Sequence, residues 1–352
     1  MEPLLKVENL HVRFASYAGN VHAVRGVSFE VGRGEVLAIV GESGCGKTVT
    51  AKAAMRLLDR TNAIVDKDSR IELDGQDMLH MPRRKLNTIR GKDISMIFQD
   101  SMTSLNPTMT VGKQIMENLL THTSMTKGAA RKRAKELLEL VEIPDPEDRL
   151  DCYPHQLSGG MRQRVMIAIA LACDPKLLIA DEPTTALDVT IQAQLLDLLG
   201  RIKEQNGMSV ILVTHDLGVV ASFAQRVQVM YAGQIVEHGT VEDIFKRPKH
   251  PYTWALLSSI PGRALSSKSE LYALKGTPPD LRRPLIGCPF AERCEYCMGI
   301  CKKQCPSETE VSEGHSASCW LCHEFAPKVQ PPRIFGCLLY TSDAADELDG
   351  VD

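Results

Sequence analysis

The chain has 352 residues, of which 43% are hydrophobic and 24% charged, with a formal net charge of −3. This composition is that of a globular protein, and its slight acidity gives no support for non-specific nucleic-acid binding. The longest apolar run, over 165–173, is far shorter than the roughly 20 residues that span a bilayer. The start, MEPLLKVENL, lacks the basic-then-apolar pattern of a secretory signal. We therefore expect a cytosolic protein that can still dock on a membrane protein.

Residues 1 to about 250 alternate short apolar runs with helical patterns. The runs EVLAIV (35–40), KLLIAD (176–181) and SVILVTH (209–215) are typical of strands that are buried on both faces of a parallel sheet. Helical patterns cover 131–143. This alternation predicts an α/β fold.

A further helical pattern covers 191–207 and ends at Asn-Gly. After it, VQVMYAGQIVEHG (227–239) predicts two strands that turn at Ala232-Gly233. The composition of the sequence changes near Pro248, where proline-rich segments begin, so we expect a domain boundary there.

A phosphate-binding loop follows the first predicted strand. GESGCGKT has the spacing of the P-loop, in which glycines let backbone N–H groups surround phosphate oxygens. The lysine reaches the β- and γ-phosphates, and the threonine hydroxyl can ligate Mg²⁺. The predicted nucleotide contacts are Gly41, Glu42, Ser43, Gly44, Cys45, Gly46, Lys47 and Thr48.

Cys45 lies inside this loop, where a thiol close to a helix N-terminus can have a lowered pKa and oxidise easily. The alternative, which we favour, is a small residue tolerated between two glycines.

A second anion-friendly loop precedes a helical pattern in LSGGMRQR (157–164). Ser158, Gly159 and Gly160 form this loop, although a P-loop already serves the phosphates of one ATP. A second phosphate-binding helix start therefore indicates another ATP, presented across a dimer interface. A plain Ser-Gly-Gly linker does not account for the helix that follows.

Acidic residues end the second predicted strand. Asp181 stands where a carboxylate can hold Mg²⁺, and Glu182 can polarise an attacking water as general base. Acidic strand ends are often only solvated, but the P-loop on the same chain favours function. His215 ends the third strand, and ligands of open α/β sheets bind at the carboxyl ends of strands. His215 can therefore meet the γ-phosphate, with a structural role as its alternative.

The segment GCPFAERCEYCMGICKKQCPSETEVSEGHSASCW contains six of the chain's 11 cysteines. In a reducing cytosol, clustered cysteines more often bind metal than form disulfides. The last residues, 337–352, resemble translated sequencing-adapter DNA, and we expect them to be non-native. A natural acidic tail is the alternative.

Together these motifs resemble those of the ATP-binding-cassette (ABC) ATPases over residues 1 to about 330. The resemblance implies a P-loop ABC-type domain over 1–250, with a RecA-like core, an antiparallel β part and a helical subdomain at about 100–165. It also implies a small cysteine-rich domain over 251–335. The stretches FQDSMTSLNPTMTVG, DEPTTALDVTIQAQ and RPKHPYTWALLSSIP look like the ATPase subunits of oligopeptide and dipeptide importers.

The resemblance also assigns roles. Phe14 falls where the family stacks an aromatic ring on adenine, with Tyr17 a weaker candidate and an ordinary strand residue the alternative. Gln99 matches the loop glutamine that senses Mg²⁺ and contacts the membrane subunit, and Asp188 matches the loop that crosses to the partner ATPase. Ser101 departs from the proline that is usual there. The implied catalytic residues are Glu182, His215, Gln99 and Lys47, and the implied Mg²⁺ ligands are Thr48, Gln99 and Asp181.

In this subfamily four cysteines of the C-terminal part are implied to hold a 4Fe–4S cluster. They match Cys288, Cys294, Cys301 and Cys319, whereas Cys297, Cys305 and Cys322 are extra. From the residues alone, four thiolates suit zinc equally well, and reduced cysteines without metal are a third possibility.

The partners that the resemblance implies are two membrane permease subunits and a second ATPase subunit, either a paralogue or another copy. The resemblance also implies that an extracytoplasmic substrate-binding protein acts indirectly, that no nucleic acid takes part, and that the subunit sits on the cytoplasmic face of the membrane. The solute that it implies is a di- or oligopeptide, with nickel or another small solute as alternative. Competing hypotheses are a soluble ABC ATPase outside transport and a non-enzymatic metal or redox sensor.

Overall fold

The computed structural model describes residues 2–17, 19–58, 61–100, 104–184, 189–259 and 274–329. Asp188, Ser101 and the 337–352 tail lie outside the described residues. Among the helices of the described ranges, none combines the length and the hydropathy that a membrane span requires.

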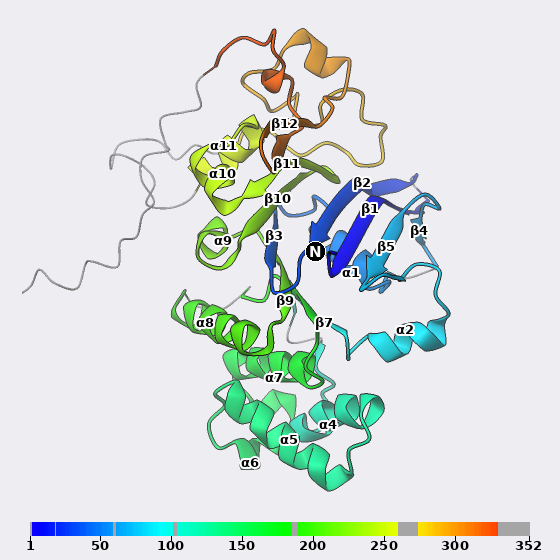
Figure 1. The fold of residues 1–352 in the computed structure, drawn as a ribbon, viewed down its shortest axis with the longest axis vertical. Helices are drawn as coiled ribbons and strands as arrows, with labels where there is room; N and C mark the ends of the chain where they lie inside the picture. Colours follow the sequence, from blue (N-terminus) through cyan, green and yellow to red (C-terminus); the bar gives the residue numbers. More distant parts are fainter. Residues whose placement is uncertain are drawn as a thin grey trace, which may run out of the picture.

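An eight-stranded sheet forms the centre of the molecule (Figure 1). In spatial order its strands are β12 (Thr309–Ser312), β13 (His315–Ala317), β11 (Gln234–Thr240), β10 (Arg226–Tyr231), β3 (Val36–Val40), β9 (Ser209–Thr214), β8 (Leu177–Asp181) and β7 (Ile94–Ile97). The strands from β10 to β7 run parallel to one another. The three predicted strands are therefore confirmed as β3, β8 and β9, and every residue of them is buried.

The predicted hairpin is also confirmed, because β10 and β11 pair antiparallel on either side of Ala232 and Gly233. Both turn residues have positive φ, 49° and 84°, which is what a two-residue hairpin turn of type I′ requires. A side chain at Gly233 would place its Cβ 2.9 Å from the carbonyl oxygen of Ala23. The turn therefore brings β2 close to the end of β10.

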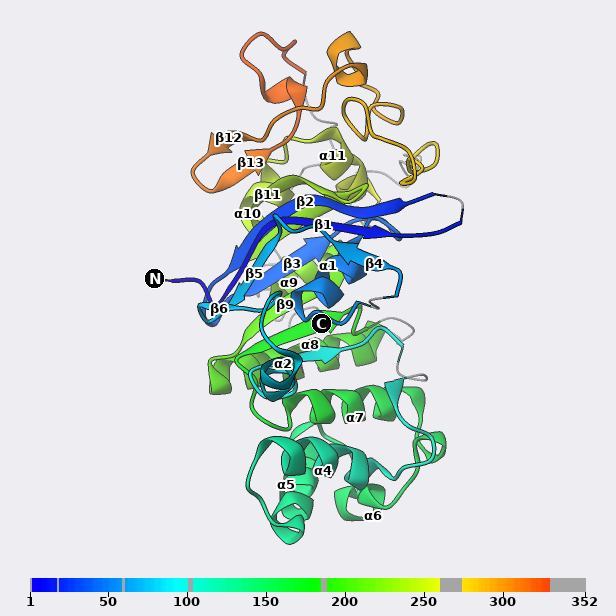
Figure 2. The ribbon, with the colours of Figure 1, turned by 90° about the vertical axis from the view of Figure 1, so that its right-hand side faces the viewer.

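A separate antiparallel sheet covers one face of the central sheet (Figure 2). Its strands are β2 (Val21–Val31), β1 (Leu5–Phe14), β5 (Arg70–Leu73) and β6 (Gln76–Asp77), with β4 (Ala63–Val65) also paired to β1. Helices α1 (Lys47–Ala54) and α2 (Arg83–Ile89) complete this layer. A single apolar cluster joins the layer to one face of the central strands, for example Ile71 to Ile39 and Ile211.

The helices on the other side of the central sheet share one apolar cluster with it. They are α4 (Val111–His122), α5 (Lys127–Leu140), α6 (Pro146–Leu150), α7 (Gly159–Leu171), α8 (Val189–Asn206) and α9 (Leu217–Phe223), with the short 3-10 turn η1 (Pro154–Gln156). The predicted helices over 131–143 and 191–207 are confirmed as α5 and α8. Helices α4 to α6 form one end of the elongated molecule, and α7 lies between them and the sheet (Figures 1 and 2).

The C-terminal part packs on the opposite end of the molecule. It comprises α10 (Val241–Lys246), α11 (Pro251–Ser258) and what we call the C-terminal segment, residues 274–329, with η2 (Gly299–Lys302) and η3 (Trp320–Cys322). Strand β13 pairs antiparallel with β11, so the C-terminal segment extends the central sheet. The rings of Tyr231, Tyr252 and Phe290 meet in one buried cluster beneath it. Sheet pairing and apolar packing thus join this segment to the central sheet.

Candidate active site

The P-loop lies between β3 and α1, as the motif predicts, and glycine is required where other backbone passes close to it. A Cβ at Gly41, where φ is 154°, would lie 2.1 Å from the carbonyl oxygen of Met230. A Cβ at Gly46, where φ is 107°, would lie 2.4 Å from the carbonyl oxygen of Ala23. Strands β10 and β2 therefore pack directly against the loop and leave room only for glycine.

Lys47 is the first residue of α1 and only 4% exposed. Its Nζ donates to the carbonyl oxygens of Gly41, at 2.7 Å, and Glu42, at 3.0 Å. The ammonium group is thus held over the loop by two neutral acceptors. Phosphate oxygens are stronger acceptors for an ammonium donor, so this arrangement suits an anionic ligand in the loop.

Thr48 and Asp181 meet although they are distant in the sequence. The Thr48 hydroxyl donates to Oδ1 of Asp181 at 2.9 Å, and Asp181 is 1% exposed. Burial raises the pKa of the Asp181 carboxyl, and the hydrogen bond from Thr48 opposes that shift. A hydroxyl and a carboxylate that converge in this way are the oxygen ligands that Mg²⁺ prefers, so the residues fit the ion.

Gln99, Glu182 and His215 converge at the edge where three neighbouring parallel strands end. Gln99 follows β7, Glu182 follows β8 and His215 follows β9. Gln99 Nε2 donates to Glu182 Oε2 at 2.8 Å, and His215 Nδ1 lies 3.4 Å from Glu182 Oε1. Glu182 adopts a φ of 46°, and its N–H donates to the carbonyl oxygen of Val213. The fold therefore brings together three of the four predicted catalytic residues, Glu182, His215 and Gln99.

The second anion-friendly loop, formed by Ser158, Gly159 and Gly160, lies at the start of α7. Ser158 is the N-cap, and its Oγ accepts from the N–H of Met161 at 3.3 Å. Ser158 and Gly159 are exposed, and nothing lies within 4 Å of a Cβ built at Gly159. Farther along the helix, buried Gln163 donates from Nε2 to the carbonyl oxygen of Pro183 at 2.6 Å. The exposed loop is thus tied, through its own helix, to the backbone beside Glu182.

The comparisons with known proteins agree with this geometry. The ABC transporter family model matches residues 24–185, and the model of the oligopeptide/dipeptide transporter C-terminal region matches residues 236–301. The oligopeptide transport ATP-binding protein OppD of Bacillus subtilis (strain 168) is 55% identical over 330 residues, 94% of this chain and 92% of the relative. The chain belongs to the ABC transporter ATP-binding proteins of the oligopeptide/dipeptide type.

Two further relatives support the family and its fold. The dipeptide transport ATP-binding protein DppD of Bacillus subtilis (strain 168) is 56% identical over 91% of this chain and 95% of its own. The ATP-binding cassette MJ0796, solved as a dimer in a post-hydrolysis state with ADP and Pi, superposes with a TM-score of 0.61 at 28% identity. It covers 67% of this chain and 98% of its own. This ABC ATP-binding protein is therefore an ATPase with the cassette fold.

Two predicted contacts of the nucleotide differ in their surroundings. Phe14 pairs with Val21 across the β1–β2 hairpin and packs half-buried against the apolar cluster beneath the antiparallel sheet, whereas Tyr17 is fully exposed. Cys45 is 6% exposed, and burial raises the pKa of its thiol. The interpretation as a small residue is therefore favoured over an easily oxidised thiolate.

The predicted cluster cysteines lie in one region of this ABC ATP-binding protein, but not as a finished ligand set. Burial raises the pKa of Cys288 to about 12 and of Cys294 to about 11, and repulsion from neighbouring thiols adds to both shifts. Burial likewise raises the pKa of Cys319, with Cys288 and Cys294 among its neighbours. In the part of the chain that the structure describes, no group of three or more His, Cys, Asp or Glu side chains is arranged to hold a metal ion.

The extra cysteines are neighbours as well. Cys305 contributes to the pKa shift of Cys288, and Cys297 contributes to that of Cys294. The predicted ligands and these two extra cysteines therefore lie in the same neighbourhood.

Two residues that contact the P-loop were missed from the sequence. Tyr252 Oη accepts from the N–H of Glu42 at 2.8 Å, and Arg293 forms a two-pronged pair with the Glu42 carboxylate. They lie 210 and 251 residues from Glu42 in the chain. No local pattern could reveal such contacts, because they depend on how α11, which carries Tyr252, and the C-terminal segment, which carries Arg293, pack against the loop.

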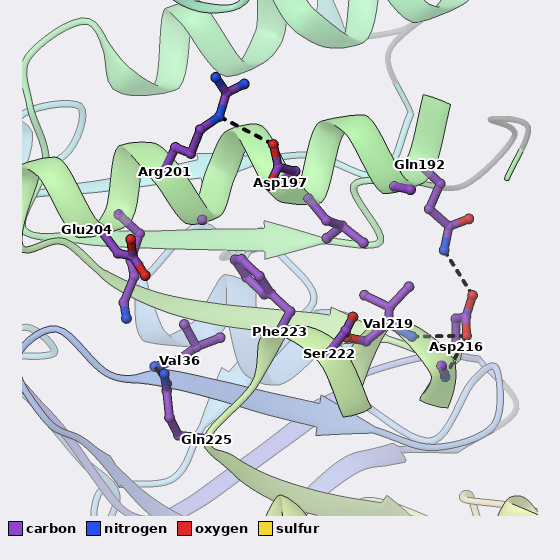
Figure 3. A pocket seen from close by; sticks show the side chains of 15 residues that line it. Val36, Gln192, Asp197, Arg201, Glu204, Asp216, Val219, Ser222, Phe223 and Gln225 are labelled. Atoms are coloured by element: carbon purple, nitrogen blue, oxygen red, sulfur yellow. Dashed lines mark hydrogen bonds and ion pairs between the residues drawn. The ribbon is translucent and has the colours of Figure 1, made fainter. Parts of the chain in front are cut away.

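A cavity of about 690 Å³ lies between α8 and α9 (Figure 3). Gln192 Nε2 donates there to Asp216 Oδ2 at 2.9 Å, and Asp216 also caps α9 (Figure 3). Its lining contains none of the predicted site residues. The hollow is therefore not the nucleotide site.

Proposed function

We propose that this chain is the ATP-hydrolysing subunit of an importer that carries di- and oligopeptides through a membrane permease. One observation carries the proposal. Relatives named for oligopeptide and dipeptide transport are 55% and 56% identical over at least 91% of both chains. The family model for the oligopeptide/dipeptide transporter C-terminal region also matches residues 236–301, which lie beyond the match to the general ABC transporter model.

In the proposed reaction, Glu182 accepts a proton from the water that attacks the γ-phosphorus of ATP. The new P–O bond forms as the bond from the γ-phosphorus to the bridging oxygen breaks, which leaves ADP and inorganic phosphate. Gln99 contacts one carboxylate oxygen of Glu182 and His215 contacts the other, so the two residues orient the carboxylate. Lys47 leaves its two carbonyl acceptors to bind β- and γ-phosphate oxygens.

Thr48, Asp181 and Gln99 would hold Mg²⁺. The ion supplies charge neutralisation for the phosphates. Thr48 and Asp181 already hydrogen-bond to each other, so their oxygen atoms lie close enough to serve one cation. Burial of Asp181 strengthens its attraction to a cation, because water does not screen it.

The ATP sites are composite in this proposal. Ser158, Gly159 and Gly160 of one subunit serve the ATP held by Lys47 of the other, and Asp188 belongs to the loop that crosses between them. The exposure of the Ser158 loop at a helix N-terminus supports this arrangement. So does the dimeric form of MJ0796.

The proposed partners are two membrane permease subunits and a second ATPase subunit, a paralogue or another copy of this chain. A substrate-binding protein outside the cytoplasm delivers the peptide, and the chain sits on the cytoplasmic face. The helices within about 100–165 are the proposed contact with the permease. They form one end of the molecule, clear of the C-terminal segment (Figure 1).

The finer assignments complete the proposal. Phe14 is proposed to stack on adenine. If it does, Phe14→Ala should raise the Kd for ATP more than Tyr17→Ala does. A 4Fe–4S cluster, with zinc as alternative, would be held by Cys288, Cys294, Cys301 and Cys319. The presence of four spaced cysteines in one part of the chain supports such a site, and a bound metal would relieve the cost of burying them as thiolates.

The test is peptide uptake by the complete transporter, reconstituted in vesicles with its permeases and binding protein. Glu182→Gln keeps the side-chain shape but removes the base, so ATP turnover and uptake should both fall roughly 10²- to 10⁴-fold. ATP binding should persist. Glu204→Gln, an exposed change on α8, is the matched control and should leave both rates unchanged. Near-normal ATP turnover with Glu182→Gln would show that Glu182 is not the base. Uptake of nickel without uptake of peptide would show that the transported solute is nickel.

A further inference from the structure

One arginine of the C-terminal segment, Arg293, forms an ion pair with the P-loop. Arg293 Nη1 donates to Glu42 Oε2 at 2.6 Å, and Nη2 donates to Glu42 Oε1 at 3.0 Å. This two-pronged geometry is the strongest form of arginine–carboxylate pairing, because both hydrogen bonds are charge-assisted and parallel. Glu42 is the second residue of the GESGCGKT loop, so the pair ties the C-terminal segment directly to the phosphate site.

Arg293 is itself held from several sides. Its side chain is 4% exposed, its Nε donates to the carbonyl oxygen of Lys275 at 3.0 Å, and Nη1 also reaches Tyr231 Oη at 3.3 Å. The guanidinium carbon lies 5.8 Å from the centre of the Tyr231 ring and 6.0 Å from that of Phe290. Most of its donors are therefore used, and the planar group has little freedom to turn away from Glu42.

Glu42 transmits this constraint to the loop. Its N–H donates to Tyr252 Oη at 2.8 Å, and its carbonyl oxygen accepts from Lys47 Nζ at 3.0 Å. The residue that Arg293 fixes by its carboxylate thus also carries one of the two acceptors of the phosphate-binding lysine. Movement of Glu42 would displace that acceptor and the start of the loop together.

Other contacts of the C-terminal segment support the same face. Arg25 Nη2 on β2 donates to the carbonyl oxygens of Leu281 and Arg283. The N–H of His22 donates to the Leu281 carbonyl as well. Between Pro278 and Pro279 on one side and the P-loop on the other lies a cavity of only about 40 Å³. The segment therefore lies close against the outside of the loop.

We propose that Arg293 is a positioning residue of the ATP site, which acts through Glu42 to hold the P-loop in the shape that accepts the phosphates. The C-terminal segment thereby sets the affinity for ATP. The inference rests on ATP binding at the P-loop, and it depends neither on which solute is transported nor on a metal in the segment.

The expected effect is on binding more than on chemistry, because the hydrogen bonds of the Arg293 side chain go to Glu42 of the P-loop, to Lys275 and to Tyr231. Arg293→Met keeps much of the side-chain volume but removes the charge and the paired donors. The Kd for ATP should rise roughly ten-fold, with the turnover of the reconstituted transporter at saturating ATP changed less than three-fold. Arg293→Lys keeps the positive charge but cannot form two parallel hydrogen bonds to the carboxylate. Its Kd for ATP should lie between that of the unchanged chain and that of Arg293→Met.

The experiment titrates the full-length chain with a fluorescent ATP analogue. Lys47→Ala identifies the signal that belongs to the P-loop. Arg282→Met is the matched control, since Arg282 is half-exposed in the same segment and pairs with Asp280. Its Kd should equal that of the unchanged chain. Glu42→Gln should raise the Kd as Arg293→Met does, and the double variant should show no further rise.

An unchanged Kd in a folded Arg293→Met protein would overturn the inference, as would two effects that multiply in the double variant. Should Arg293→Met fail to fold, Glu42→Gln decides alone, and an unchanged Kd there is equally fatal. If the unchanged chain gives no Lys47-dependent signal, the proposed ATPase function fails instead.

Discussion

The buried Glu237 carboxylate joins three parts of the chain, and removing it should loosen the C-terminal segment. Its side chain is fully buried. Oε1 accepts from the N–H of Lys249 at 2.7 Å and from His315 Nε2 at 2.8 Å, and Oε2 accepts from the N–H of His250 at 2.9 Å. The carboxylate thus connects β11 to the start of α11 and to β13.

The magnitude follows from the groups that Glu237→Ala leaves behind. Two backbone N–H groups and one imidazole lose their acceptor inside the protein, at about 1–3 kcal/mol each. The variant no longer buries a carboxylate, which offsets part of that cost. We expect the free energy of unfolding to fall by about 3–4 kcal/mol, a large share of the roughly 5–15 kcal/mol of an ordinary domain.

Urea unfolding followed by tryptophan fluorescence measures this change, because Trp254 is buried on α11 and its Nε1 donates to the carbonyl oxygen of Pro248. Hydrogen exchange should show the amides of β13 losing protection first. Glu242→Ala is the control, since Glu242 forms an exposed pair with Lys246 that contributes less than about 0.5 kcal/mol. A loss below about 1 kcal/mol in Glu237→Ala would refute the reasoning.

Three further predictions concern pH, assembly and metal. Burial lowers the pKa of His250 from 6.5 to about 4, so the unfolded chain takes up the proton first. The free energy of unfolding should fall by up to about 3 kcal/mol as the pH is lowered from 6.5 toward 4. His250→Asn should reduce this fall when unfolding by urea is measured across that pH range, and the same pH dependence in the variant would contradict the prediction. Mixing Lys47→Ala with Ser158→Arg subunits should restore ATPase activity above either alone, whereas hydrolysis by a demonstrable monomer argues against composite sites. Protein purified without oxygen should contain iron and sulfide in matching amounts, which Cys288→Ser abolishes and Cys297→Ser spares; neither iron nor zinc in the folded chain would end the metal hypothesis.

Features that depend on neighbouring residues could be predicted from the sequence. The strand, P-loop and helix around Lys47 follow from an apolar run, glycine spacing and a helix start that are contiguous in the chain. The same holds for the β10–β11 hairpin, where Ala232 and Gly233 make the turn. Residues that end neighbouring parallel strands must meet at one edge, so the meeting of Asp181, Glu182 and His215 also followed from local patterns.

Tertiary structure alone decided the contacts of the C-terminal segment. The strand pairing of β13 with β11 and the grip of Arg293 on Glu42 join residues far apart in the chain, and neither has a local signature. Burial also sets the direction of the pKa shift of Cys45: a place near a helix start can lower the pKa of a thiol, whereas the packing around Cys45 raises it, in line with the favoured interpretation as a small residue. The physical reason is the same in each case: spacing along the chain determines local conformation, whereas desolvation and long-range pairing depend on which distant residues fill the space around a group.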